Sequence, residues 1–425
     1  MTQCDGDTGG EPDKKEAEED HYFIKLISFY LFIFFNCNTK QNRNCNFAKI
    51  FVLRSPPRHA ALAVDPMLRK TAVVATSTIL AGCAYITYQR RPFSTYNEPE
   101  LYHHDHQLLH PVDREKSNEN KFRSFQEDTI SSKIVRSLTL SAVTGLCRAY
   151  LSTCNVEIIN LDKFHAILNQ SWEAAQRQDY ENGRPVLTVS NHMSTIDDPI
   201  ITSRIAPMAM LAPSGVKRHR WGGCSEEICF KTTALASFFG AGKVLPIWRG
   251  GGLQQEMFEE LGTHLQPGGW VHLFPEGGIC QHRLNRSDVP VRRRTYMRWG
   301  VGKMIAKSKH RPIIVPFFHS GMEKALPLDE ETGATLRWAP KMGVEMRIVF
   351  GDPIVVDDLL DAFVAKYGRE GLETPWAGLG VGVEGGQVGE VEEEEHVLEL
   401  YAALTERVHL KMQELDERVV WDGVV

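Results

Sequence analysis

The amino-acid sequence predicts an α/β fold: a mostly parallel sheet flanked by helices on both faces, with right-handed crossovers and N-terminal membrane-associated helices. From Asn155 onward, strand patterns alternate with helix patterns. Residues 186–190 are rich in β-branched side chains and are bounded by Pro185 and Asn191, which is typical of a short buried strand. Residues 164–176 repeat apolar side chains at helical spacing. About six strands are expected, near Val156, Val186, Val244, Trp270, Ile313 and Met346.

Composition sets the class of protein. The chain has 425 residues, of which 42% are hydrophobic and 24% charged, so it is globular and long enough for one large domain with extensions. A formal net charge of −6 excludes an overall basic character, and no nucleic-acid partner is expected. The nine cysteines form no CxxC motif, which fits a reduced or sparsely oxidised protein. Cys224 and Cys229 are expected to pack in the protein rather than to bind a metal.

The first 131 residues precede the predicted domain. Residues 1–66 are expected to be disordered or an upstream extension of the coding sequence, because their acidic start is the opposite of a mitochondrial presequence. Residues 67–91 form a candidate membrane or targeting segment, in which the uncharged residues 71–88 lie between basic flanks. Residues 92–131 are interpreted as a polar linker. Their stretch 101–106 (LYHHDH) resembles a metal cluster, but no second ligand set at zinc-like spacing follows, and no metal is expected.

Residues 134–151 follow as a predicted helix with few charges. A helix of this composition can lie along a bilayer surface or be an ordinary buried helix, and the sequence favours neither.

His192 and Asp197 form the candidate reaction centre. His192 follows the strand predicted at 186–190, and α/β sheets place ligand-handling loops at the carboxyl ends of strands. On an ideal helix, side chains five residues apart point in directions about 140° apart around the axis, so they cannot meet along one helix. His192 and Asp197 can therefore pair only across a tight turn. A carboxylate on one imidazole nitrogen fixes the tautomer and stabilises the imidazolium after proton uptake. Two alternatives stay open: a surface histidine beside a helix-capping aspartate, and Asp198 as the orienting group.

Two further strands end in chemically informative residues. Residues 244–249 end on Arg249, and residues 270–278 run into a Pro-Glu-Gly turn. NHxxxxD, a strand ending on arginine, and FPEG, in this order and spacing, resemble the motifs of the glycerolipid acyltransferase superfamily. Longer strings resemble its mitochondrial phospholipid–lysophospholipid transacylases. They are Asn191–Pro199, Ile228–Phe230, Phe274–Gly277, Arg298–Gly302, Pro312–Pro316 and His319–Met322.

The resemblance implies a glycerol-3-phosphate acyltransferase-like domain over residues 132–370. It implies that His192 acts as general base on the free hydroxyl of a lysophospholipid and that Asp197 orients His192. The implied reaction is coenzyme A-independent acyl transfer from a phospholipid to monolysocardiolipin, which remodels cardiolipin and needs no cofactor. The implied partners are phospholipids, lysophospholipids and a cardiolipin-rich membrane. The implied location is the inner or outer mitochondrial membrane, facing the intermembrane space, and a homo-oligomer is left open.

Substrate binding is assigned by the same resemblance to Arg249, Glu276, Gly277 and Arg298. Arginine suits bidentate phosphate binding, and the glutamate and glycine of the turn suit a glycerol headgroup. Acyl-CoA-dependent relatives usually follow FPEG with Thr-Arg, whereas this chain has Gly278 and Ile279. The basic run that leads to Arg298 is interpreted as the replacement for that arginine.

Two other functions stay open. One is an acyl-CoA-dependent lysophospholipid acyltransferase, which shares the same fold. The other is a non-catalytic membrane protein that binds anionic lipid. Substitution of His192 separates the second from an enzyme, because a binding protein would keep its lipid affinity.

The sequence also predicts the environment or structure of several other segments. Residues 217–221 (KRHRW) are expected at a membrane interface, or in a solvated loop over a core helix. Residues 281–311 contain ten Lys or Arg and one acidic residue, Asp288. This excess of positive charge predicts either a cationic surface that binds anionic headgroups or a solvated loop. Residues 371–395 are a Gly- and Glu-rich insertion, and residues 396–425 are expected to form a C-terminal amphipathic helix.

Overall fold

The structure is a computed structural model that describes residues 129–248, 252–281, 297–329, 335–337, 339–369, 372 and 394–418. The predicted segments 1–66 and 67–91 lie outside the described residues, as do almost all of 92–131 and of 371–395. In the part of the chain that is described, no helix has both the length and the apolar character needed to cross a membrane.

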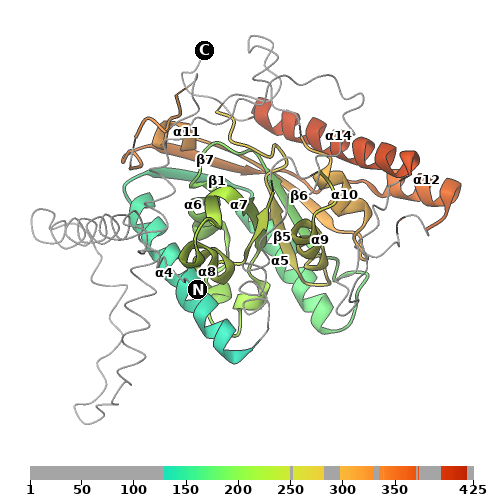
Figure 1. The fold of residues 1–425 in the computed structure, drawn as a ribbon, viewed down its shortest axis with the longest axis horizontal. Coiled ribbons are helices and arrows are strands. Elements are labelled where there is room, and N and C mark those ends of the chain that lie inside the picture. Colours follow the sequence, from blue (N-terminus) through green and yellow to red (C-terminus); the bar gives the residue numbers. More distant parts are fainter. Residues whose placement is uncertain are drawn as a thin grey trace, which may run out of the picture. The chain divides into compact units, whose positions relative to one another are not determined.

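A seven-stranded sheet with the order β1-β7-β6-β2-β5-β3-β4 forms the centre of the described residues (Figure 1). The strands are β1 (Asn155–Ile159), β2 (Val186–Ser190), β3 (Trp221–Ser225), β4 (Val244–Ile247), β5 (Trp270–Leu273), β6 (Ile313–Ser320) and β7 (Glu345–Phe350). All neighbouring strands are parallel except β6 and β7, which are antiparallel. The predicted α/β fold with a mostly parallel sheet is confirmed.

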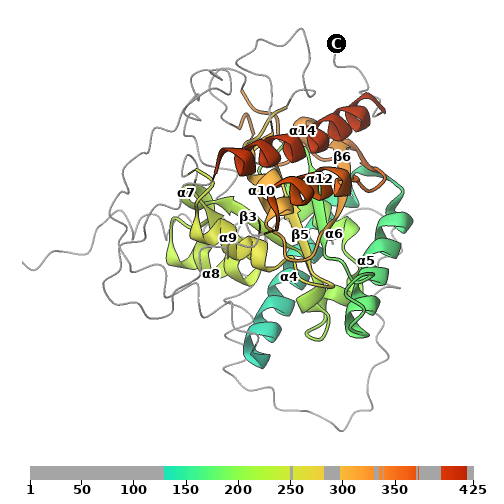
Figure 2. The ribbon, with the colours of Figure 1, turned by 90° about the vertical axis from the view of Figure 1, so that its right-hand side faces the viewer.

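Helices cover both faces of this sheet (Figures 1 and 2). α5 (Leu161–Gln176) and α6 (Asp197–Ile205) pack on the face that includes Val186, Trp270 and Phe317. α9 (Glu256–Thr263), α10 (Gly300–Ala306) and α14 (Glu395–Arg418) pack on the face that includes Leu187, Val271 and Phe318. α12 (Asp357–Tyr367) lies beside α14, as Figure 2 shows. Apart from α4, the other elements of the described residues are α7 (Glu226–Cys229), α8 (Thr233–Ala241), α11 (Met322–Ala325) and the 3-10 turns η2 (Met208–Leu211) and η3 (Val216–Arg218).

α4 (Ile130–Leu151) includes the predicted helix at residues 134–151, for which the sequence left two environments open, a bilayer surface or the protein core. It begins after Thr129, whose hydroxyl accepts the backbone N–H of Ser132 at 3.1 Å. One face packs against α6 and buries Leu140, while the opposite face exposes Ile134 and Leu138. α4 also contacts α8, η2 and η3, so it packs against several elements of the domain and keeps one exposed apolar face.

β3 is the strand that the sequence pattern did not predict. Its second and third residues are Gly222 and Gly223, and glycine is depleted in strands. The segment 217–221 was predicted at a membrane interface or in a solvated loop. Lys217 is exposed, but His219, Arg220 and Trp221 are buried, so the prediction is wrong for these three residues. Inside the protein, the Arg220 guanidinium forms an ion pair with Asp198 and donates to the carbonyl of Gly242.

Cys224 and Cys229 connect the end of β3 to α7 through a disulfide, with their Cα atoms 6.1 Å apart. The sequence favoured packing over metal binding for these two residues and did not predict the disulfide between them. Within the described ranges, Cys147, Cys154 and Cys280 take no part in a disulfide.

His264 gives a testable pH dependence of folding. Its ring stacks on Trp221, with centroids 3.9 Å apart. Burial lowers the pKa of His264 to about 3, and the positive charges of Lys243 and Arg136 act in the same direction. The Glu260 carboxylate lies 3.7 Å from His264 Nε2 and is outweighed by these effects. Since the unfolded side chain titrates near 6.5, only the unfolded chain gains this proton as the pH falls towards 3.

We therefore expect the free energy of unfolding to fall with decreasing pH below about 6.5, with a slope from His264 of about 1.4 kcal/mol per pH unit. His264→Phe keeps an aromatic ring against Trp221 but cannot be protonated, so its unfolding free energy should fall less steeply. Urea denaturation of both proteins between about pH 7 and pH 5 measures the difference. Equal slopes would show that His264 does not stay neutral in the folded protein.

Candidate active site

The candidate site lies where three neighbouring parallel strands end. β2 lies between β5 and β6 and is parallel to both, so the carboxyl ends of the three strands meet at one edge of the sheet. His192 follows β2, the Phe274–Gly277 turn follows β5, and His319 lies at the end of β6. Residues far apart in the sequence are thereby brought to one place.

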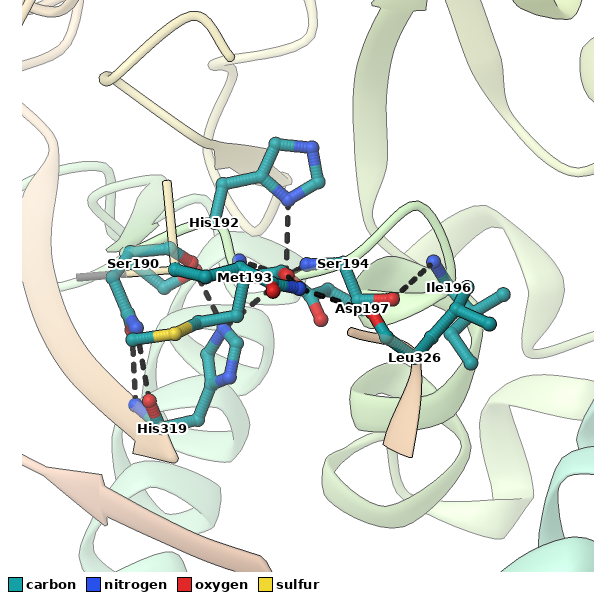
Figure 3. A network of polar contacts seen from close by, with 10 residues as sticks. Ser190, His192, Met193, Ser194, Ile196, Asp197, His319 and Leu326 are labelled. Atoms are coloured by element: carbon teal, nitrogen blue, oxygen red, sulfur yellow. Dashed lines mark hydrogen bonds and ion pairs between the residues drawn. The ribbon is translucent and has the colours of Figure 1, made fainter. Parts of the chain in front are cut away.

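The His192–Asp197 pair is formed across a tight turn, as the spacing required. His192 Nδ1 lies 3.0 Å from Asp197 Oδ2 (Figure 3). Because a carboxylate oxygen can only accept, Nδ1 carries the proton and Nε2 keeps its lone pair. The same Asp197 oxygen accepts the backbone N–H groups of Met193 at 2.5 Å and Ser194 at 2.8 Å. Asp197 is completely buried, whereas the His192 side chain is 20% exposed, so the free ring nitrogen can reach a substrate.

Asp198 is directed to different partners. Its carboxylate forms a close ion pair with Arg220 and accepts the hydroxyl of Thr202 at 3.2 Å. The geometry therefore places Asp197, and not Asp198, against the His192 ring.

The Phe-Pro-Glu-Gly turn packs directly on His192. The Phe274 ring stacks on the imidazole with centroids 4.2 Å apart, and the backbone N–H of His192 donates to the Glu276 carboxylate. Burial raises the pKa of Glu276 well above its usual value, the His192 N–H opposes this rise, and Asp197 and Asp416 add to it. Glu276 Oε2 is buried and has no hydrogen-bond partner among the described residues. A protonated Glu276 would offer an O–H donor beside His192.

Gly277 and Arg298 lie against each other beyond this turn. Gly277 has a φ of +69°, and a Cβ atom there would lie 3.2 Å from Arg298 Cγ. The backbone N–H of Arg298 donates to the Pro275 carbonyl at 2.7 Å, and its side chain is exposed. The structure thus brings Arg298 next to the turn that carries Glu276. Arg249 and most of the basic run, including residues 292–294, lie outside the described residues.

Two residues that hold the His192 loop were missed by sequence reasoning. Gln281 donates its side-chain amide to the carbonyls of Met193 at 2.7 Å and Leu326 at 3.0 Å, and it accepts the N–H of Leu328 at 2.9 Å. The other is His319, which contacts the loop from β6. Gln281 was missed because a single glutamine does not belong to a motif with a characteristic spacing. His319 belonged to a motif string but had no assigned role.

Within the described ranges, no group of three or more His, Cys, Asp or Glu residues is placed to hold a metal ion. The stretch 101–106 lies outside these ranges.

Comparisons with known proteins identify the family of the chain. An acyltransferase family model matches residues 171–320, which include the three strand ends of the site. N-acylphosphatidylethanolamine synthase from Arabidopsis thaliana is 31% identical over 288 residues, which cover 66% of this chain and 92% of the plant protein. Taffazin from Dictyostelium discoideum is 29% identical, over 52% of this chain and 69% of its own length. Tafazzin from Saccharomyces cerevisiae is 28% identical, over 52% of this chain and 62% of its own length. The chain therefore belongs to the acyltransferase family and is a tafazzin-like member of it.

Proposed function

We propose that this acyltransferase moves an acyl chain from one phospholipid to the free hydroxyl of a lysophospholipid without coenzyme A, with monolysocardiolipin as the principal acceptor. The observation that carries the proposal is the His192–Asp197 pair, in which the carboxylate holds Nδ1 and leaves Nε2 free. The similarity to the tafazzin relatives supports the choice of reaction.

In the proposed reaction, His192 Nε2 takes the proton of the acceptor hydroxyl while that oxygen attacks the acyl carbonyl of the donor phospholipid. The ester bond to the donor glycerol then breaks, and the imidazolium returns the proton to the departing oxygen. The products are an acylated acceptor and a lysophospholipid, so atoms and charge balance. Asp197 stabilises the imidazolium between the two proton transfers.

Substrate placement is assigned to the turn after β5. Glu276 would hold a glycerol or phosphate oxygen through its buried carboxyl, next to Gly277. Arg298, exposed beside that turn, would bind a lipid phosphate through its guanidinium. Arg249 keeps its proposed phosphate-binding role on the basis of its motif. This chemistry places the enzyme on a phospholipid membrane, which we propose to be a mitochondrial membrane.

A second acceptor is considered because the plant relative matches over 92% of its own length. That protein is an N-acylphosphatidylethanolamine synthase by name. The same histidine could take the proton of an amine as it does that of a hydroxyl. The second candidate is therefore acyl transfer to the amino group of phosphatidylethanolamine.

The test uses the purified full chain and bilayers of phosphatidylcholine with labelled acyl chains. Monolysocardiolipin and phosphatidylethanolamine are supplied in separate reactions without coenzyme A, and labelled acyl-CoA replaces the phosphatidylcholine donor in a parallel set. Label in cardiolipin without coenzyme A supports the proposal. Label only in N-acylated phosphatidylethanolamine supports the second candidate, and transfer only from acyl-CoA contradicts the transacylase. No transfer from either donor would favour lipid binding without catalysis.

A further inference from the structure

His319 is a buried histidine that contacts both ends of the turn carrying the His192–Asp197 pair. It lies in β6, whose Phe317 pairs with Ser190, the last residue of β2. The side chain is 1% exposed. His319 therefore reaches the candidate site from below the turn, on the side away from the free nitrogen of His192 (Figure 3).

The first contact is a three-bond connection between His319 and Asn191, the residue before His192. The Asn191 side chain donates to the His319 carbonyl at 2.9 Å and accepts the His319 backbone N–H at 2.9 Å. The His319 ring Nε2 lies 2.9 Å from the Asn191 carbonyl oxygen. Because that oxygen can only accept, Nε2 carries the hydrogen and donates it. These bonds fix the peptide from which the His192 side chain projects.

The second contact is with Asp197. His319 Nε2 lies 3.6 Å from Asp197 Oδ2, the oxygen that also faces His192 Nδ1. One N–H group thus faces the carbonyl at the start of the turn and the carboxylate at its end. Burial lowers the pKa of His319, with Asp197 and Asn191 opposing and His192 assisting this effect. The ring is therefore a neutral dipole near neutral pH and adds no competing positive charge to the pair.

We propose that His319 is a positioning residue for acyl transfer, holding Asn191 and Asp197 at the separation that keeps Asp197 on His192 Nδ1. This inference rests on the proposed role of His192 as the base. His319 is buried under the turn, away from the free nitrogen of His192, so in this proposal it does not contact the substrate. Its removal should therefore lower kcat and leave substrate binding almost unchanged.

The test compares His319→Leu, which lacks a donor, with His319→Gln, whose amide nitrogen can approach the position of Nε2. His219→Leu is the matched control, because His219 is equally buried but lies just before β3, where its ring faces the Arg220 carbonyl instead of the pair. We expect His319→Leu to lower kcat by about 10- to 100-fold, with KM changed less than about threefold. The loss is smaller than the roughly 10²- to 10⁴-fold contribution of a general base, because His192 itself remains. His319→Gln should recover most of the lost kcat, and His219→Leu should keep the wild-type kcat per folded molecule.

A second measurement does not depend on activity. The rate at which diethylpyrocarbonate modifies His192, followed by peptide mass spectrometry across a pH series, reports the fraction of neutral imidazole. Among the described residues, titratable groups near the pair include Glu276 at the His192 N–H, His319 at Asp197, and Glu323, whose raised pKa reflects burial and Asp197. Cys280 also lies nearby, since its backbone N–H donates to the His192 carbonyl. When Asp197 loses its fixed position, the imidazolium loses stabilisation, so the midpoint in His319→Leu should fall by about half a pH unit or more.

The outcomes separate this inference from the proposed function. An unchanged midpoint together with equal kcat in His319→Leu and His219→Leu overturns the positioning role. Equal damage in His319→Leu and His319→Gln overturns it as well, because the N–H donor would then be irrelevant. Absence of transfer in the wild-type protein refutes the proposed function, while the midpoint still decides whether His319 positions Asp197.

Discussion

His192→Ala is expected to lower kcat for acyl transfer by about 10²- to 10⁴-fold, the usual contribution of a positioned general base. Without the imidazole, the acceptor hydroxyl must lose its proton to water as it attacks the donor carbonyl. KM should change little, because lipid phosphate and glycerol are bound by other residues in the proposed mechanism. The measurement is the initial rate of label transfer from phosphatidylcholine to monolysocardiolipin at several acceptor concentrations.

The matched control for this prediction is His310→Ala. His310 precedes β6 and therefore lies at the amino end of that strand, opposite the candidate site. Its replacement should leave both kcat and the thermal unfolding temperature close to wild type. A kcat of His192→Ala equal to that of His310→Ala would remove His192 from the reaction. A large drop in folded protein would instead show that His192 is mainly structural.

Gly302→Ala is expected to cause a large loss of stability through a single methyl group. Gly302 lies in α10, where a Cβ atom would overlap the backbone carbonyl of Tyr401 in α14 and lie 2.7 Å from Thr405 Oγ1. The obstacle is mainly backbone, so the two helices must separate. Overpacking of this kind costs about 1–3 kcal/mol and occasionally more. The unfolding temperature should fall by roughly 2–4 °C for each kcal/mol in a domain of this size.

Gly145→Ala, in another helix, is the control for this prediction, because the same change should raise stability there. Gly145 lies in α4, is exposed, and a Cβ atom added there would meet no other atom within 4 Å. Because alanine has a higher helix propensity, this change should raise stability by about 0.5–1 kcal/mol. Thermal unfolding of both variants decides the prediction. A Gly302→Ala protein as stable as wild type would show that α10 and α14 are not in close contact.

The fold was predictable because its main signal is local. β2 and β5 are short apolar runs that end at recognisable turns, and both appeared where the pattern placed them. β3 was not predicted, because Gly222 and Gly223 are untypical of a strand. The basic and aromatic residues 217–221 before them were also interpreted as a membrane interface or a solvated loop. The burial of Arg220 depends on Asp198, a partner 22 residues away that no local pattern identifies.

Within the candidate site, only contacts between residues of the same sequence motif could be predicted. His192 and Asp197 lie five residues apart, so a turn between them could be anticipated, and the structure places them 3.0 Å apart. The roles of Gln281 and His319 depend on β2, β5 and β6 ending together. His319 is 128 residues from Asn191 in the sequence, and only the sheet order reveals that they are in contact. Such long-range hydrogen bonds carry no periodic signal.

The central claim is that the acyl chain passes directly from donor to acceptor, with His192 as a base and no acyl-enzyme. A covalent intermediate would release lyso-phosphatidylcholine in a burst equal to the enzyme concentration before any acceptor is added. The decisive measurement is rapid quenching of the enzyme with labelled phosphatidylcholine alone, followed by lipid analysis and intact-protein mass spectrometry. We predict no burst and an unmodified protein mass, with transfer beginning when monolysocardiolipin is added. A stoichiometric burst with an acyl group on the protein, for example on Cys280 beside the His192 carbonyl, would contradict the account.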